Sequence, residues 1–397
     1  MLISSIPYGW TLYQKISCFV FFIGYAVYLW YAKPWRGWHW RRQNWLYVVM
    51  LVIWLMIPVR QLFDATPATD YFQYQWHKHE WFLYIGIIGL LGFSDKLTLR
   101  QVAWVMLGTS VVMFLHCAYL YYFTAEYSDY PSLARWDLLR LTHIHSHMVM
   151  NLYINGALVA ALCAWRTIRH TGEKVAMSLA MLIAWSVILL SAGRTGLVGS
   201  LVIVGGTIVY IVFRLNRYAG LACGVLVVAG GLLFVLTRPR INLEVFKNDP
   251  RVAIWDYSER MAAEKPIGGY GFSTLSEQYV EQAYTDSVMY NGFVARIIET
   301  NPAFYNQGKT MQTHHPHNAF LLYWLAIGIF GLLAFVALFI VAACLPLGEN
   351  RVFLWLFLIA LFLQCMTEPV GAHVLPQFIA IMLFVLEHCH RSAVQPL

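Results

Sequence analysis

The sequence has few charged residues for its length. Asp, Glu, Lys and Arg make up 12% of the 397 residues, whereas 59% of the residues are hydrophobic. A soluble globular domain carries roughly a quarter charged residues, so this composition excludes an ordinary soluble protein. A chain this apolar has the bilayer as its solvent, where helices satisfy the backbone within a single segment. We therefore predict an all-α polytopic membrane protein.

Two other common features are missing. The seven cysteines form no Cys-x-x-Cys pair and lie in or near apolar runs, which favours small buried side chains over disulfides or a metal cage. No glycine-rich nucleotide-binding loop is present. The formal charge of +7 comes mostly from short loops between apolar runs, so it indicates the orientation of the spans and no nucleic-acid partner.

Apolar segments account for most of the chain, and each is close to the ~20 residues that a membrane helix needs. About eleven spans are expected, or twelve if a short helix lies before residue 16 or within 63–80. The predicted spans are 16–32, 44–62, 80–94, 102–124, 147–165, 175–192, 195–213, 219–237, 318–345, 352–367 and 374–390.

Lys and Arg are concentrated in alternate loops, beginning with the loop after the first span. The positive-inside rule makes those loops cytoplasmic. Arg194, the N-terminus and the long loop 238–318 then lie on the outer side. We expect residues 1–397 to form one membrane domain that carries this loop on its outer face.

The long loop is rich in apolar and aromatic residues, which argues against disorder. In the stretch 251–265, Val252, Trp255, Glu259 and Ala262 recur at helical spacing and predict an amphipathic helix. Residues 266–272 contain Pro and three Gly, typical of a turn, and residues 273–284 predict a second helix.

Two arginines are candidates for binding an anion. Arg194 lies at a break between two apolar spans, where a guanidinium is costly without an anion or a counter-charge. The small residues around it would let a ligand approach the backbone. Arg251 opens the first predicted loop helix, whose N-terminus attracts anions. The alternatives are an arginine that snorkels to a head group and an ordinary solvated arginine. Arg296 is a further candidate, for which a solvated position is the simpler interpretation.

Histidines gather where the long loop meets the next span, in Thr313–Asn318. His317 is the best candidate for a general base, because histidine accepts a proton near neutral pH. His315 would orient His317 or help to hold an anion. Asn318 would orient a hydroxyl or a sugar. A purely structural role for these residues is the alternative.

Other histidines precede the third and fifth spans. His147 is one helical turn before Asn151, so the two would line the same cavity or hydrogen-bond between helices. Together the outer histidines would offer zinc ligands, but their spacing matches none of the usual zinc motifs. We therefore predict no metal and no cofactor.

Three segments, taken in order, resemble the O-antigen ligase family of bacterial membrane glycosyltransferases. Ser191–Gly196 is similar to the family's Arg-bearing break between spans. Arg251 followed by Pro266–Phe272 is similar to its loop segment with a Pro-x-x-Gly-x-Gly turn. His317-Asn318, then nine residues, Gly328 and Gly331, is similar to its signature after the long loop. The resemblance covers mainly the C-terminal half of the chain.

The resemblance implies a reaction in lipopolysaccharide biosynthesis, on the periplasmic side of the bacterial inner membrane. An O-antigen glycan would pass from undecaprenyl diphosphate to a sugar hydroxyl of lipid A–core. Arg194 and Arg251 would hold the diphosphate and His317 would act as the base, which gives inversion without a metal. The family usually has twelve spans with both ends cytoplasmic. The expected partners are the two lipid-linked substrates and membrane lipids.

Three alternatives remain open. An O-antigen or exopolysaccharide polymerase, or a protein O-oligosaccharyltransferase, would use the same donor and carries a looser form of the signature. A lipid-linked glycan transporter would need the arginines only for binding. The nearly charge-free span interiors and the polar groups at the outer edge favour an enzyme over a transporter.

Overall fold

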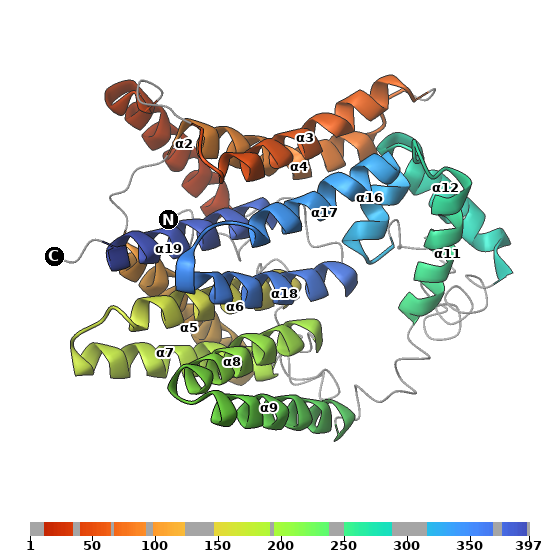
Figure 1. Ribbon diagram of the computed structural model, residues 1–397. Coiled ribbons are helices and arrows are strands. Elements are labelled where there is room, and N and C mark those ends of the chain that lie inside the picture. The colour runs from red at the N-terminus through yellow and green to blue at the C-terminus, as the bar shows by residue number, and fades with distance from the viewer. Residues whose placement is uncertain are drawn as a thin grey trace.

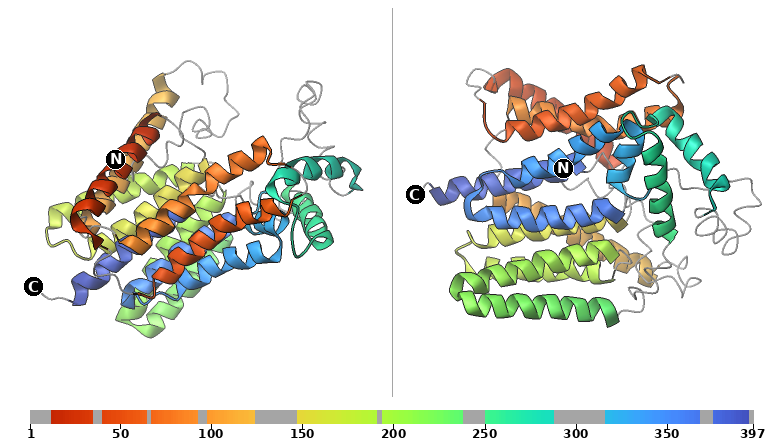
Figure 2. Two further views of the ribbon diagram at one scale, coloured as in Figure 1. Left: turned by 90° about the horizontal axis from the view of Figure 1, so that it is seen from above. Right: turned by 45° about the vertical axis from the view of Figure 1, so that its right-hand side comes forward.

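A computed structural model of the protein describes residues 12–34, 40–64, 67–92, 98–123, 147–190, 194–237, 250–287, 316–367 and 375–394. The described residues form helices and no strands, which confirms the predicted all-α class. Among the described residues, eleven helices or helix pairs make the body of the molecule. A helical hairpin lies beyond one end of it (Figures 1 and 2). The body helices are α2 (Leu12–Ala32), α3 (Asn44–Leu62), α4 (Asp70–Leu91), α5 (Leu99–Phe123), α6 (His147–Trp165), α7 (Thr171–Leu190), α8 (Arg194–Leu215), α9 (Arg217–Thr237), the pair α16 (Ala319–Ile327) and α17 (Ile329–Ala343), α18 (Arg351–Thr367) and α19 (Leu375–Val394).

These helices match the predicted spans, and five of them are long and apolar enough to cross a membrane. Four more described helices are apolar but shorter. Residues 70–79 belong to α4 and form no separate helix, so a twelfth span does not come from that stretch. The residues before 12, where another short helix was considered, lie outside the described residues.

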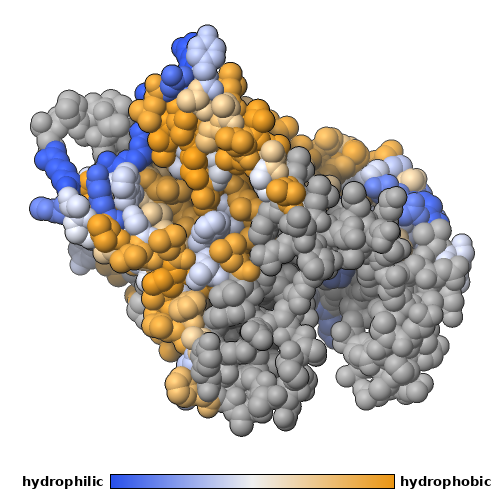
Figure 3. Space-filling view, turned by 90° about the horizontal axis from the view of Figure 1, so that it is seen from below, coloured by the Kyte–Doolittle hydropathy of each residue, from blue (hydrophilic) through white to orange (hydrophobic). Residues whose placement is uncertain are grey.

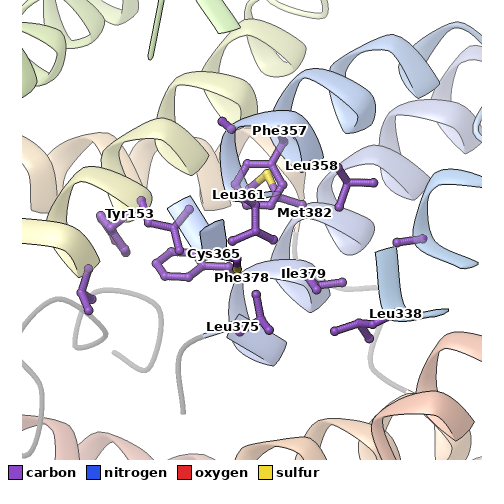
Figure 4. Packing of buried hydrophobic residues seen from close by; sticks show 14 of the residues in the cluster. Tyr153, Leu338, Phe357, Leu358, Leu361, Cys365, Leu375, Phe378, Ile379 and Met382 are labelled. Atoms are coloured by element: carbon purple, nitrogen blue, oxygen red, sulfur yellow. The ribbon is translucent and has the colours of Figure 1, made fainter. Parts of the chain in front are cut away.

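α6 lies at the centre of the body, and every residue from 149 to 161 is buried. It packs against α5, α7, α8, α18 and α19. Figure 4 shows Tyr153 of α6 in one apolar core with residues of α18 and α19. The outer helices expose apolar side chains instead: Leu221, Val225 and Leu226 of α9 are 63–71% exposed. Apolar side chains also cover much of the described surface in Figure 3. An apolar outside of this kind fits a lipid environment.

The long loop contains the two expected helices, α11 (Pro250–Glu264) and α12 (Phe272–Thr285). The residues that recur at helical spacing form only part of the buried face of α11: Ala262 is 1% exposed and Trp255 is half-buried. Ile254, Tyr257 and Met261 are at most 2% exposed, whereas Val252 is 40% exposed and Glu259 faces outward. The reason is tertiary: α11 packs against α16, and Tyr257 contacts Tyr279 of α12, with ring centroids 5.0 Å apart.

The predicted span 318–345 is not one helix. It is divided at Gly328, which has φ +82°, into α16 and α17, and the two halves meet at an angle (Figure 1). A break in an apolar helix leaves backbone groups that need partners. Here the partners come from the turn between α11 and α12. The amides of Tyr270 and Gly271 donate to the carbonyls of Leu325 and Ala326, at 2.7 and 2.9 Å.

Candidate active site

His317 and Asn318 form the start of α16, and each has a distinct local role. Asn318 is the N-cap: its Oδ1 accepts from the amides of Phe320 (2.9 Å) and Leu321 (3.2 Å), and the residue is 4% exposed. His317, immediately before the cap, has φ +48° and is half-buried. Such a backbone is uncommon for a residue with a side chain, although His, Asn and Asp adopt it more readily than most. The cap and the turned backbone together hold the imidazole at the entrance to the helix.

Asn318 therefore has a structural role in addition to the one expected from the sequence. We predicted that its side chain orients a substrate hydroxyl, but its oxygen is engaged by two backbone N–H groups. An N-cap of this kind contributes about 1 kcal/mol to helix stability. Pro316, also buried, precedes His317 and fixes the direction of the chain into the turn.

Arg251 is the second residue of α11, directly after Pro250, and is half-buried. Proline at the first helical position is favourable because its missing N–H would have had no helical partner. The positive end of the helix dipole lies at this terminus, which suits a bound anion. The sequence placed Arg251 at a helix start, and the structure confirms that position.

Arg194 begins α8. Gly196, two residues later, lies directly against α6: a Cβ atom added to it would stand 2.4 Å from the Cβ of Asn151. The carbonyl of Gly196 also accepts from Nδ2 of Asn155, at 3.2 Å. We expected the glycines here to let a ligand approach the backbone. For Gly196 the close neighbour is the buried side chain of Asn151, so this glycine serves helix packing.

The starts of α8, α11 and α16 lie at the same end of the body. The hydroxyls of Thr195 and Thr367 are 2.8 Å apart, which joins the start of α8 to the end of α18. Phe362, near that end of α18, packs against Phe320 in the first turn of α16, with ring centroids 5.0 Å apart. α11 lies beside α16 (Figure 1 and the right panel of Figure 2). Arg194, Arg251 and His317 thus each stand at a helix N-terminus at one end of the molecule.

The structure says less about the remaining candidate site residues. His147 begins α6, at the same end of the body, and Asn151 follows one turn later, fully buried. His315 and Arg296 lie outside the described residues. The two described histidines of the group before the third span point to different partners. Nδ1 of His77 lies 2.7 Å from Oε1 of Glu80 at the surface, whereas His79 is buried and contacts Tyr323.

Arg260 joins the two helices of the hairpin, α11 and α12. Nη1 and Nη2 of Arg260 donate to the two carboxylate oxygens of Asp286, just after α12, and Nη2 also lies 3.0 Å from Asp256. These carboxylates raise the pKa of Arg260, the hydrogen bond to Asp286 most of all. Burial raises the pKa of both Tyr257 and Tyr279, which contact each other between the two helices.

Sequence reasoning missed Arg60 entirely. This residue lies in the last turn of α3, and the sequence suggested for it only a charge near a short loop. Its guanidinium donates to the carbonyls of Gly268 and Gly269 in the turn after α11. The only sequence hint was an arginine in the last turn of an otherwise uncharged span. Its partners are more than 200 residues away, so no local pattern could have identified them.

Comparisons with known proteins agree with the motifs. Residues 179–336 match the family model described as O-antigen ligase. The matched region begins in α7 and ends in α17, so it includes Arg194, Arg251, His317 and both Gly328 and Gly331. A search of curated proteins found no match. On the strength of this match and of the motifs within it, residues 179–336 contain a domain of the O-antigen ligase family.

Proposed function

We propose that the protein transfers an O-antigen glycan from undecaprenyl diphosphate to a sugar hydroxyl of lipid A–core, on the periplasmic side of the bacterial inner membrane. One observation carries the proposal: the candidate base His317 and the two candidate arginines each stand at a helix N-terminus at the same end of the body. The donor carries its own activation in the lipid diphosphate, so the reaction needs no nucleotide.

In this mechanism the hydroxyl oxygen of the acceptor attacks the anomeric carbon of the donor sugar. Its proton passes to the imidazole of His317. The bond between the anomeric carbon and the diphosphate oxygen breaks, and the electron pair leaves with undecaprenyl diphosphate. Displacement from the opposite face inverts the anomeric configuration.

Arg194 and Arg251 would bind the diphosphate and stabilise the negative charge that grows on it. The positive ends of α8 and α11 add to this field, because backbone N–H groups there have no helical acceptor. Fixed positive groups of this kind offset the same charge that a divalent cation offsets in many diphosphate sites. The proposal therefore expects transfer to persist when EDTA is present.

The test is transfer by purified protein in proteoliposomes that contain undecaprenyl diphosphate-linked glycan and lipid A–core, with EDTA. His317→Asn is a better test than His317→Ala, because asparagine tolerates the positive φ of this position and has no basic nitrogen. His77→Asn is the matched control: this histidine side chain is 63% exposed and pairs with Glu80. Loss of a general base costs about 10²–10⁴-fold in rate.

The proposal predicts that wild type and His77→Asn form the joined product and that His317→Asn loses it by that factor. Retention of activity within about tenfold in His317→Asn would show that His317 is not the base. Extension of the donor glycan by wild type would make the protein a polymerase. If neither product forms and labelled donor crosses the bilayer, the protein is a transporter.

A further inference from the structure

We propose that Arg60 is a positioning residue, which locks the turn Pro266–Gly271 onto the break between α16 and α17. This lock makes α11 and α16 one rigid unit, so that Arg251 and His317 keep a fixed relation. The inference rests on the proposed function for its effect on catalysis, but the lock itself can be tested separately.

The turn and the break exchange backbone hydrogen bonds. In a continuous helix the amide of Ile329 would donate to the carbonyl of Leu325. Here the Ile329 amide donates instead to the carbonyl of Pro266, at 2.8 Å, and the Leu325 carbonyl accepts from Tyr270. The indole of Trp324 also donates to Pro266, at 3.3 Å. The turn therefore satisfies the backbone groups that the break leaves open, which the surrounding apolar environment requires.

The two backbones approach so closely that side chains are excluded. A Cβ atom added to Gly328 would lie 1.9 Å from the carbonyl oxygen of Ile267, and one added to Gly269 would lie 2.6 Å from the Gly328 nitrogen. Both glycines have positive φ, +82° and +63°. Gly269 of the Pro-x-x-Gly-x-Gly turn and Gly328 of the Gly-x-x-Gly segment are therefore two halves of one interlocking contact.

Arg60 closes this contact from the side of α3. Its Nε donates to the carbonyl of Gly268 at 2.5 Å, and its Nη2 donates to the carbonyl of Gly269 at 3.1 Å. Its Cζ and the carboxylate of Asp64 lie against Gly271, where an added Cβ would overlap Asp64. Only the planar fork of arginine offers two donors in this fixed geometry, so lysine is not an equivalent replacement.

Two further bonds hold the start of α12 to the same region. The hydroxyl of Ser273 donates to Oε1 of Gln61, the neighbour of Arg60, at 2.5 Å. The hydroxyl of Thr69, the N-cap of α4, donates to the carbonyl of Ser273 at 3.3 Å. Side chains at the end of α3 and the start of α4 thus hydrogen-bond to the turn that joins α11 to α12 and to the start of α12.

The lock acts on the candidate site through the two helices it joins. The C-terminal ends of α11 and α16 meet at the turn and the break, and the helices pack along each other. They therefore run in the same direction, and their N-termini carry Arg251 and His317. At 1.5 Å per residue, α11 is about 22 Å long and α16 about 14 Å. Loosening the joined ends shifts the far ends, and a displacement of about 1 Å costs on the order of 10²-fold in rate.

The test compares Arg60→Met and Arg60→Lys with wild type, in nanodiscs. Arg351→Met is the matched control, because Arg351 also donates its Nε to a backbone carbonyl, that of Ala343, but at the opposite end of α17. Amide hydrogen exchange at Tyr270, Gly271 and Ile329 measures the lock directly. Steady-state kinetics give kcat and the KM for the donor, and thermal midpoints measure global stability.

We expect Arg60→Met to speed exchange of those three amides at least tenfold and to lower kcat by about 10-fold or more, with KM for the donor changed less. Arg60→Lys has a single donor nitrogen, so its exchange rates and its kcat should lie between those of Arg60→Met and wild type. Arg351→Met should leave exchange at the turn and kcat unchanged.

Unchanged exchange in both Arg60 variants would overturn the lock. Faster exchange with kcat within twofold of wild type would overturn the positioning role. A fall in kcat that only follows the unfolded fraction would reduce Arg60 to a stabilising residue. If wild type forms no joined product, the proposed function fails, whereas the exchange result still decides whether the lock exists.

Discussion

Gly196 of α8 lies so close to Asn151 of α6 that a Cβ atom on the glycine would stand 2.4 Å from Nδ2 of the asparagine. Asn151 is fully buried, so its side chain has little room to move. Gly196→Ala should therefore lower stability by about 1–3 kcal/mol, the usual cost of overpacking. It should also disturb Arg194, two residues earlier. The thermal midpoint in detergent and the transfer rate would both report the change.

Gly230→Ala is the matched control for that substitution. Gly230 lies within α9, a membrane helix like α8, and nothing stands within 4 Å of an added Cβ. Alanine there should be neutral or slightly stabilising, because it favours the helix more than glycine does. Equal thermal midpoints for the two variants would mean that the contact with Asn151 is easily relieved.

Asn318 offers a second prediction, because a cap and a substrate ligand respond differently to substitution. Asn318→Asp keeps an oxygen that accepts the amides of Phe320 and Leu321 and adds a charge that a helix N-terminus favours. It should retain stability, whereas Asn318→Ala should lose about 1 kcal/mol. Thermal midpoints give the comparison. If the aspartate variant is as stable as wild type but inactive, the amide group itself is needed for transfer.

The helices were predictable from the sequence, because a backbone in lipid must bond within its own segment and so reveals itself by long apolar runs. The bounds 44–62 and 147–165 are those of α3 and α6. The helix starts at Arg194 and Arg251, and the position of His317 before a helix, also follow from local sequence. Helix boundaries depend mostly on neighbours along the chain, and so these positions could be inferred.

The break at Gly328 could not be predicted in this way. The run from 319 to 343 is continuously apolar, and glycine alone does not end a membrane helix. The break exists because Pro266–Gly271 supplies new partners for the freed backbone groups. Arg60 was missed for the same reason, since its acceptors are remote in sequence. The buried face of α11 also could not be predicted from its own sequence, because α12 and α16 decide which side is covered.

His79 and Tyr323 give a third prediction. Nδ1 of His79 lies 2.6 Å from the carbonyl oxygen of Gln75, which can only accept, so Nδ1 carries the proton. Nε2 must then accept from the hydroxyl of Tyr323, at 2.9 Å. Both side chains are buried, at 1% and 3% exposure. Tyr323→Phe leaves Nε2 without its donor and should lower stability by about 1–3 kcal/mol.

The double variant His79→Leu with Tyr323→Phe tests this explanation. It removes both buried polar partners, and an apolar pair of similar shape can be nearly neutral. In urea or thermal unfolding in detergent, the double variant should be more stable than Tyr323→Phe alone. A double variant that is less stable by the sum of both single losses would mean that packing, and not the hydrogen bond, holds α4 to α16.

Adjacent glycines in the turn provide the fourth prediction. Gly269 has φ +63°, and an added Cβ would lie 2.6 Å from the Leu325 oxygen, whereas nothing stands within 4 Å of a Cβ added to Gly268. Gly269→Ala should therefore separate the turn from the break, with faster amide exchange at Ile329 and a large loss of transfer. Gly268→Ala should leave both unchanged, since its carbonyl still accepts from Arg60. The two variants differ by one position, so unequal results would isolate the backbone contact as the cause. Equal activity in both would show that the turn can leave the break without moving His317 or Arg251, which removes the physical basis for the lock.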